Sequence, residues 1–201
     1  MKQIRITRSY GVVTFETVSI DTSENVFFTN MDTEQPHWPE LSTNQLGPAP
    51  SPNSSQCTVP QPKSPLPPPF PYVYKYGCKI SGHENEVGII NVFNPLAAGT
   101  TTLPSAKVGT PIASPVQVVT GGMSPYQISG QVFQVTDNNG SIIERGSGSI
   151  GPGLQLQPSS DSTGITVTGT PTVVGTYNFT FIVNDAKGAN LQQVQYSMAV
   201  A

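Results

Sequence analysis

The most constraining feature of the sequence is a series of short runs of β-branched and aromatic residues, each closed by turn-forming residues. Two strands are predicted within residues 3–20, and further strands at 26–30, 72–76 and 88–93. Beyond residue 104 the spacing becomes regular, with strands predicted at 116–120, 126–129, 132–136, 141–144, 154–157, 165–169, 175–184 and 191–200. Asn139-Gly140 has the composition of a type I′ hairpin turn, which needs positive φ at both central positions. No segment has helical periodicity, so the pattern predicts an all-β chain.

Length and proline placement indicate two domains. The chain has 201 residues, which suits two domains of about 100 residues each. Residues 48–71 carry ten prolines and predict a long, stiff surface loop; docking of this segment into an aromatic-lined groove is the alternative. Small residues between Pro95 and Pro104 predict a linker at 96–103. The expected domains are therefore 1–95 and 104–201.

Charge argues against two classes of partner. The sequence has nine Lys and Arg residues and twelve Asp and Glu residues, which gives a net charge of −3. Nucleic acids and anionic membranes both demand clustered basic residues, so neither is expected to bind. No apolar run reaches the ~20 residues of a membrane span.

The N-terminal segment does not favour one compartment strongly. It is basic, but it lacks the apolar core of a secretory signal. Cytoplasmic residence, another route out of the cell and a signal already removed all stay open. We prefer an extracytoplasmic, cell-surface or virion-associated location.

Two histidines and one cysteine fall where a mononuclear copper site needs them. His37 follows the strand at 26–30, Cys78 ends the tyrosine-rich strand, and His83 comes five residues later, before the strand at 88–93. A thiolate and two imidazoles make an electron-transfer copper site, because this set tolerates both Cu(I) and Cu(II). The pattern predicts one copper ion on His37, Cys78 and His83.

These two segments resemble the cupredoxin family. Residues 26–37 look like the family's stretch in which a hydrophobic strand ends in Asn-x-Asp and leads to the first copper histidine. Residues 74–83, with Cys-x4-His spacing of the azurin type, look like its C-terminal ligand loop. The resemblance covers about the first 95 residues and implies a Greek-key β-sandwich.

The axial position departs from the family. No methionine follows His83, and azurin-type spacing puts the axial slot on Val87. A carboxylate from Glu84 or Glu86, or the backbone carbonyl of Pro36, is an alternative. A site that has lost its metal also stays open.

Other interpretations of these residues also stay open. A disulfide between Cys57 and Cys78 would consume the thiolate and end the copper interpretation. Trp38 suits shielding of the site, a partner contact or plain packing. Tyr72, Tyr74 and Tyr76 alternate on one face of a strand and are expected to pack rather than carry electrons.

The second half resembles the bacterial putative-Ig family, related to cadherin-like repeats. The similarity lies in Gly121-Gly122 with Pro125-Tyr126, in the run 151–154, and in the run 165–180 with Gly169, Pro171 and Tyr177. It implies an immunoglobulin-like sandwich in which Tyr177, Phe179 and Phe181 face the core and Asp185 closes the last hairpin. Such domains are spacers or assembly modules.

Two functions follow from these observations. The first is a non-enzymatic copper electron-transfer module tethered to an Ig-like spacer, with a redox protein as partner. The alternative is a metal-free structural subunit of a fibre, virion or surface layer, which would self-assemble through β edges and the proline-rich loop.

Overall fold

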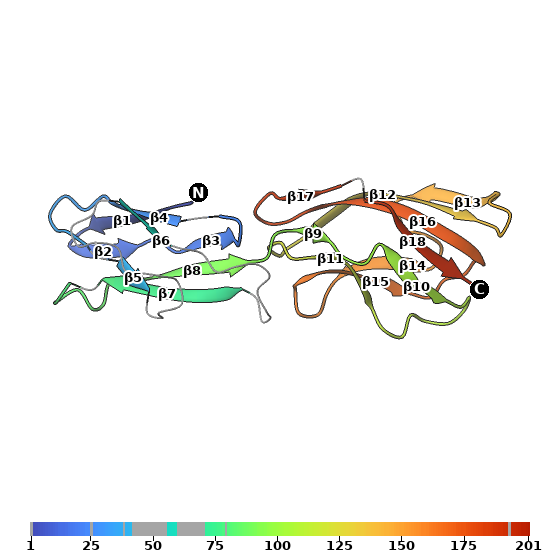
Figure 1. Ribbon diagram of the computed structural model, residues 1–201, viewed down its shortest axis with the longest axis horizontal. Helices are drawn as coiled ribbons and strands as arrows, with labels where there is room; N and C mark the ends of the chain where they lie inside the picture. The colour runs from blue at the N-terminus through green and yellow to red at the C-terminus, as the bar shows by residue number, and fades with distance from the viewer. Residues whose placement is uncertain are drawn as a thin grey trace. The chain divides into compact units, whose positions relative to one another are not determined.

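The computed structural model describes residues 2–24, 26–37, 39–41, 56–59, 71–78, 80–192 and 194–201, with backbone alone for 40, 41 and 56–59. Contacts divide the chain into Met1–Asn94 and Pro95–Ala201, called here the first and second units. No helix occurs among the described residues, which confirms the all-β prediction (Figure 1). The same residues accordingly contain no helix long and apolar enough to cross a membrane.

The first unit is made of two four-stranded sheets. One has the order β2-β1-β4-β6 and the other β3-β8-β7-β5. Each contains one parallel pair, β1 with β4 and β3 with β8. The strands are β1 (Lys2–Ser9), β2 (Val12–Phe15), β3 (Val18–Asp21), β4 (Val26–Asn30), β5 (Pro39–Leu41), β6 (Gln56–Val59), β7 (Tyr72–Cys78) and β8 (Val87–Phe93).

The core of the first unit lies between these sheets. Alternate residues of β1, β4, β7 and β8 are buried, as expected for strands with one face on a core. Tyr74 and Tyr76 are buried and Tyr72 packs against them, so the predicted packing role of the tyrosines is confirmed. The buried set is Ile4, Ile6, Phe15, Val18, Ile20, Val26, Phe28, Tyr74, Tyr76, Ile90 and Val92.

The second unit also has two sheets. The larger has the order β10-β18-β16-β12-β13, with β17 also paired to β16, and the smaller has the order β14-β15-β11-β9. The strands are β9 (Ala97–Ala98), β10 (Thr102–Ala106), β11 (Val116–Thr120), β12 (Gln127–Thr136), β13 (Ile142–Ser147), β14 (Leu154–Pro158), β15 (Gly164–Gly169), β16 (Gly175–Asn184), β17 (Asn190–Leu191) and β18 (Tyr196–Val200).

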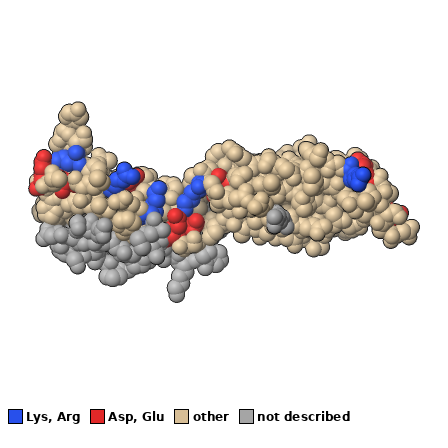
Figure 2. All heavy atoms as spheres, turned by 90° about the horizontal axis from the view of Figure 1, so that it is seen from above, with Lys and Arg blue, Asp and Glu red and all other residues tan. Residues whose placement is uncertain are grey.

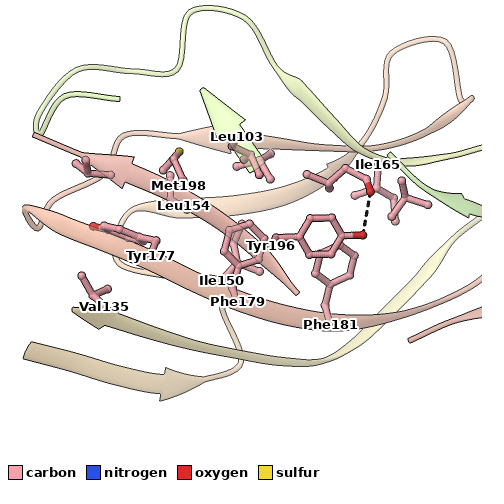
Figure 3. Packing of buried hydrophobic residues seen from close by; sticks show 14 of the residues in the cluster. Leu103, Val135, Ile150, Leu154, Ile165, Tyr177, Phe179, Phe181, Tyr196 and Met198 are labelled. Carbon is pink, nitrogen blue, oxygen red and sulfur yellow. Dashed lines mark hydrogen bonds between the residues drawn. The ribbon is translucent and has the colours of Figure 1, made fainter. Parts of the chain in front are cut away.

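Aromatic rings fill the middle of the second unit. Tyr196 stacks on Phe181 with ring centroids 4.9 Å apart and on Phe179 at 5.5 Å (Figure 3). The Tyr196 hydroxyl donates to the Val118 carbonyl at 2.9 Å, so the one polar atom of this ring is satisfied within the core. Tyr177, Phe179 and Phe181 alternate inward along β16, as the sequence predicts.

The predicted linker at 96–103 is wrong in this structure. Residues 97–98 form β9 and residues 102–106 form β10, and both strands lie at sheet edges of the second unit. Small residues and a proline do not prevent pairing at an edge, because an edge strand needs hydrogen bonds on one side only.

Strand β6, within the segment predicted as a proline-rich loop, pairs with β4. The rest of that loop, apart from Pro71, lies outside the described residues.

Three further details of the second unit differ from the sequence prediction. The runs at 126–129 and 132–136 are one strand, β12, with a bulge between Ser129 and Val132. The predicted strand at 191–200 is two strands, β17 and β18. The turn at Asn139-Gly140 has positive φ at Gly140 alone, because the Asp137 carboxylate accepts the N–H groups of Asn139 and Ser141 and closes a longer turn.

Candidate metal centre

Four potential ligand side chains converge at one end of the first unit. His37 lies in the loop between β4 and β5, Cys78 is the last residue of β7, and His83 and Glu86 lie in the loop that leads to β8. Their nearest ligand atoms all lie within 4.8 Å of one another. The structure therefore brings together the three residues that the sequence predicts as ligands, with Glu86, one of the alternatives for the axial position, beside them.

The loop that carries three of these side chains is closed by its own backbone. The Cys78 N–H donates to the Glu86 carbonyl at 3.0 Å, and the N–H groups of His83 and Glu86 each donate to a carbonyl three residues earlier. Gly82 has φ of +89°, which an L side chain rarely adopts. This turn holds the His83 and Glu86 side chains beside Cys78.

The Glu86 carboxylate lies between the two imidazoles. Its Oε2 is 2.9 Å from His37 Nδ1 and 3.2 Å from His83 Nδ1. The Cys78 Sγ lies 3.6 Å from the same His83 nitrogen. Metal–nitrogen bonds of about 2.0 Å and metal–sulfur bonds of about 2.3 Å put neighbouring donors about 3.3–3.6 Å apart in a tetrahedron. Several of the observed separations are already near this spacing.

His37 is the buried member of the cluster. It is 1% exposed, whereas the His83 side chain keeps 15% of its surface. Phe15 meets the His37 ring edge-on, with centroids 5.9 Å apart. One imidazole thus lies inside the sandwich and the other near its surface.

The ion pair between Arg8 and Asp32 contacts the other ring nitrogen of His37, Nε2. His37 Nε2 is 2.7 Å from Asp32 Oδ2, and the Asp32 side chain has no exposed surface. Arg8 on β1 donates to both Asp32 oxygens, at 2.8–3.1 Å. The Arg8 guanidinium holds the pKa of the Asp32 carboxyl well below its usual range, and the hydrogen bonds from the His37 ring and the Glu34 N–H act in the same direction.

The predicted axial position is corrected. Val87 is 64% exposed, whereas Glu86, one residue earlier, has a carboxylate oxygen within 4.8 Å of the ligand atoms of the three predicted ligands. The reason is the strand alternation: Val87 begins β8 with its side chain outward, opposite Gly77 of β7. Glu84, the other carboxylate considered, accepts the Gly82 N–H at 2.9 Å, and this bond lowers its pKa.

Some predictions about the site lie outside the described residues. They are Trp38 and the alternative of a Cys57–Cys78 disulfide, which involves the side chain of Cys57. The backbone places Cys57 on β6, in the sheet opposite the one that contains Cys78.

The residue that sequence reasoning missed is Arg8. It lies on β1, far from the predicted ligands in sequence, and its clamp on Asp32 depends on the parallel pairing of β1 with β4. Asp32 belongs to the Asn-x-Asp pattern, but nothing in that pattern names its partner. β1 carries three basic residues, Lys2, Arg5 and Arg8, and nothing in their spacing distinguishes Arg8.

The residues present fit a copper ion. The set offers a soft thiolate, two imidazole nitrogens and a carboxylate oxygen, which suits copper and also suits Zn²⁺. The second unit offers no comparable group: among the described residues, this cluster is the one set of three or more potential ligands. Asp185 accepts three backbone N–H groups, those of Met123, Lys187 and Ala189, and so closes a hairpin as predicted.

Comparisons with known proteins give no family for the chain. No protein-family model matches it, and no curated protein matches it. Among solved structures, it is similar to fibronectin(III)-like modules of Clostridium thermocellum CbhA, with 13% identity over 92% of this chain and 89% of that one and a TM-score of 0.29. It is also similar to SGBP-B of the Bacteroides ovatus mixed-linkage glucan utilization locus, solved with a mixed-linkage heptasaccharide, with 10% identity, 94% and 45% coverage, and a TM-score of 0.25.

The chain thus spans less than half of SGBP-B. Likenesses at these TM-scores carry no argument about function. Neither description mentions a metal, so the comparisons lend copper no support.

Proposed function

We propose that the first unit is a mononuclear copper-binding module of the electron-transfer type, and that the second unit is an Ig-like spacer. The observation that carries this proposal is the convergence of His37, Cys78, His83 and Glu86, with ligand atoms within 4.8 Å of one another. When bound, copper supplies a one-electron couple between Cu(I) and Cu(II).

Each side chain has a distinct role in this proposal. Cys78 supplies the thiolate, and His37 and His83 supply Nδ1 nitrogens. Glu86 supplies a carboxylate as the fourth ligand, in place of the axial position that the sequence pattern put at Val87. The burial of His37 and the partial exposure of His83 support a path for an electron to a partner protein through the His83 edge.

The test is a Cu(II) titration of the reduced full-length chain under anaerobic conditions. We expect an intense visible band from thiolate-to-copper charge transfer that saturates at one equivalent. Cys78→Ser should abolish the band and Cys57→Ser should keep it, which makes the second cysteine a matched control. No band in the wild type, with both thiols counted as free or as one disulfide, would overturn the proposal.

A metal-free structural subunit is the second candidate, and one observation favours it. Every residue of β13 is exposed, at the edge of the larger sheet of the second unit, and Ile142 and Ile143 are 51% and 49% exposed. An exposed edge strand that carries two isoleucines can act as a template for pairing with another chain. Sedimentation equilibrium of the wild type and of Ile143→Lys tests this: concentration-dependent assembly lost in the variant supports it, and a monomer throughout argues against it.

A further inference from the structure

Beyond the proposed ligands, the metal site includes a buried chain of polar contacts that reaches β1. It runs from Arg8 to Asp32 and then to His37, and each contact is 3.1 Å or shorter. Neither the Asp32 side chain nor the His37 side chain is exposed. Buried charged groups are costly unless paired, so a pair placed beside a proposed ligand calls for a reason.

The Asp32 carboxylate can only accept from His37. Its Oδ1 accepts from Arg8 Nε at 3.1 Å and from the Glu34 N–H at 2.9 Å. Its Oδ2 accepts from Arg8 Nη2 at 2.8 Å and lies 2.7 Å from His37 Nε2. The ion pair with Arg8 and the hydrogen bond from the Glu34 N–H stabilise the ionised form of this carboxylate. The His37 Nε2 must therefore carry the hydrogen of the shared bond.

The consequence falls on the other nitrogen of the ring. His37 Nδ1 lies 2.9 Å from Glu86 Oε2, beside His83 and Cys78, and without a metal this contact also holds a hydrogen. A metal ion displaces that hydrogen, and Nδ1 becomes an electron-pair donor while Nε2 keeps its own hydrogen. An imidazole that donates to a carboxylate is also a stronger donor on its free nitrogen, because the carboxylate stabilises positive charge on the ring.

We propose that Asp32, clamped by Arg8, is the positioning residue that fixes His37 with Nε2 protonated and Nδ1 directed at the metal, and so favours Cu(II) over Cu(I). This inference rests on the proposed function. It concerns a residue outside the ligand set, and its role is to orient His37 and strengthen it as a donor.

The chain offers a matched pair of variants. Asp32→Asn keeps the size of the side chain and replaces one acceptor oxygen by an NH₂ group, which would reverse the bond to Nε2. Glu34→Gln removes the same charge two residues away, on a side chain that is 69% exposed and lies 3.4 Å from the same Arg8. The control therefore alters the charge near Arg8 without touching His37.

The first measurement is the ring-nitrogen NMR spectrum of the metal-free wild type. A His37 Nε2–H signal protected from exchange with water is expected, and its loss is expected in Asp32→Asn but not in Glu34→Gln. A wild-type His37 with no proton on Nε2 would overturn the inference even if no variant folds.

The second measurement is copper affinity by competition with a chelator. Asp32→Asn should bind Cu(II) 10–100-fold more weakly, the usual cost of losing an outer partner of a ligating histidine, with a smaller change for Cu(I). The reduction potential would then rise. Equal losses in Asp32→Asn and Glu34→Gln would overturn the positioning role and leave the proposed function standing. A wild type that binds no copper would overturn the proposed function itself, and the metal role of Asp32 with it.

Discussion

The two units are both β-sandwiches, yet they differ in what they bury. The first unit encloses His37 and Asp32, whose polar atoms face other side chains from distant parts of the sequence. The second unit buries a stack of Phe179, Phe181 and Tyr196, and its buried Asp185 serves only backbone N–H groups. In the view of Figure 2, charged side chains also gather over the first unit, while most of the second carries none.

This difference shows how one architecture can serve two purposes. A core of stacked rings gains stability from the burial of apolar surface, and it requires only that the neighbouring side chains pack closely against it. A buried ionic chain contributes little net stability compared with apolar packing, because desolvation offsets most of the attraction. Its presence in the first unit, beside the proposed ligands, supports the chemical role proposed there.

The largest expected effect separates the two cores. Phe179→Ala should lower the free energy of unfolding of the second unit by about 3–5 kcal/mol, because it empties space beneath Tyr196. Urea unfolding followed by circular dichroism measures this, and Trp38, the chain's single tryptophan, reports the first unit by fluorescence. Ile142→Ala, on an exposed side chain, is the control. A Phe179→Ala protein that also loses its copper band would break the comparison, because the units would then not be independent.

A pair of glycines sharpens the account of the second unit. Gly153 and Gly140 have nearly equal φ, +79° and +80°, but a Cβ on Gly153 would lie 1.9 Å from the Thr170 carbonyl oxygen and one on Gly140 would meet nothing within 4 Å. Gly140→Ala should lower the free energy of unfolding by about 1–2 kcal/mol, because an L side chain is disfavoured at positive φ. Gly153→Ala should cost clearly more, measured as the shift in urea midpoint. Equal losses of stability in the two variants would mean that the loop around Gly153 can shift to relieve the clash with the Thr170 carbonyl.

The ligand loop gives a test confined to the first unit. Glu86→Gln should weaken Cu(II) binding about 10-fold and move the charge-transfer band, because a neutral amide replaces a carboxylate beside both imidazoles. Val87→Ala should change neither, since its side chain faces solvent. The reverse result would restore Val87 as the axial neighbour.

A smaller effect is expected from the single polar contact in the aromatic stack. Tyr196→Phe removes the donor to the buried Val118 carbonyl and should cost about 1 kcal/mol. Thermal unfolding at neutral pH measures it. A more stable variant would indicate that the buried hydroxyl destabilises the aromatic core. Both units would then contain a buried polar group that lowers their stability.

The last expected effect is a pH dependence of stability that is confined to alkaline pH. Burial raises the pKa of Tyr196 to about 12, so folding favours its neutral phenol. The resulting stabilisation is complete below the unfolded pKa of about 10 and is lost as the pH rises toward 12. Urea midpoints of the second unit should be flat from pH 7 to about 9.5 and then fall, with a shallower fall in Tyr196→Phe.

Much of this architecture can be predicted from local patterns in the sequence. β4 and β16 begin and end where their composition predicts, because each is a run of strand-forming residues with clear turn signals on both sides. The convergence of His37, Cys78 and His83 could be predicted for a similar reason: two of them share one short loop, and the third follows a distinctive strand.

What could not be predicted depends on contacts between distant residues. The bulge that makes β12 one strand arises from its pairing with β16, and the edge strands at 97–98 and 102–106 exist only because neighbouring strands accept them. The Arg8–Asp32 clamp requires β1 to lie beside β4 in parallel. The choice of Glu86 over Val87 depends on which residue starts β8, a boundary that composition does not fix.

The closed ligand loop has a consequence for how the metal would be acquired. Cys78, His83 and Glu86 stand within nine residues of sequence and are held by the turn's own backbone hydrogen bonds, while His37 comes from a remote part of the chain. A newly made chain could therefore capture an ion on this local segment before the sheets assemble. Ions that also bind the unfolded chain stabilise the folded one less. Metal loading would then guide the order of assembly more than it raises the final stability, with the arrival of His37 as the closing step.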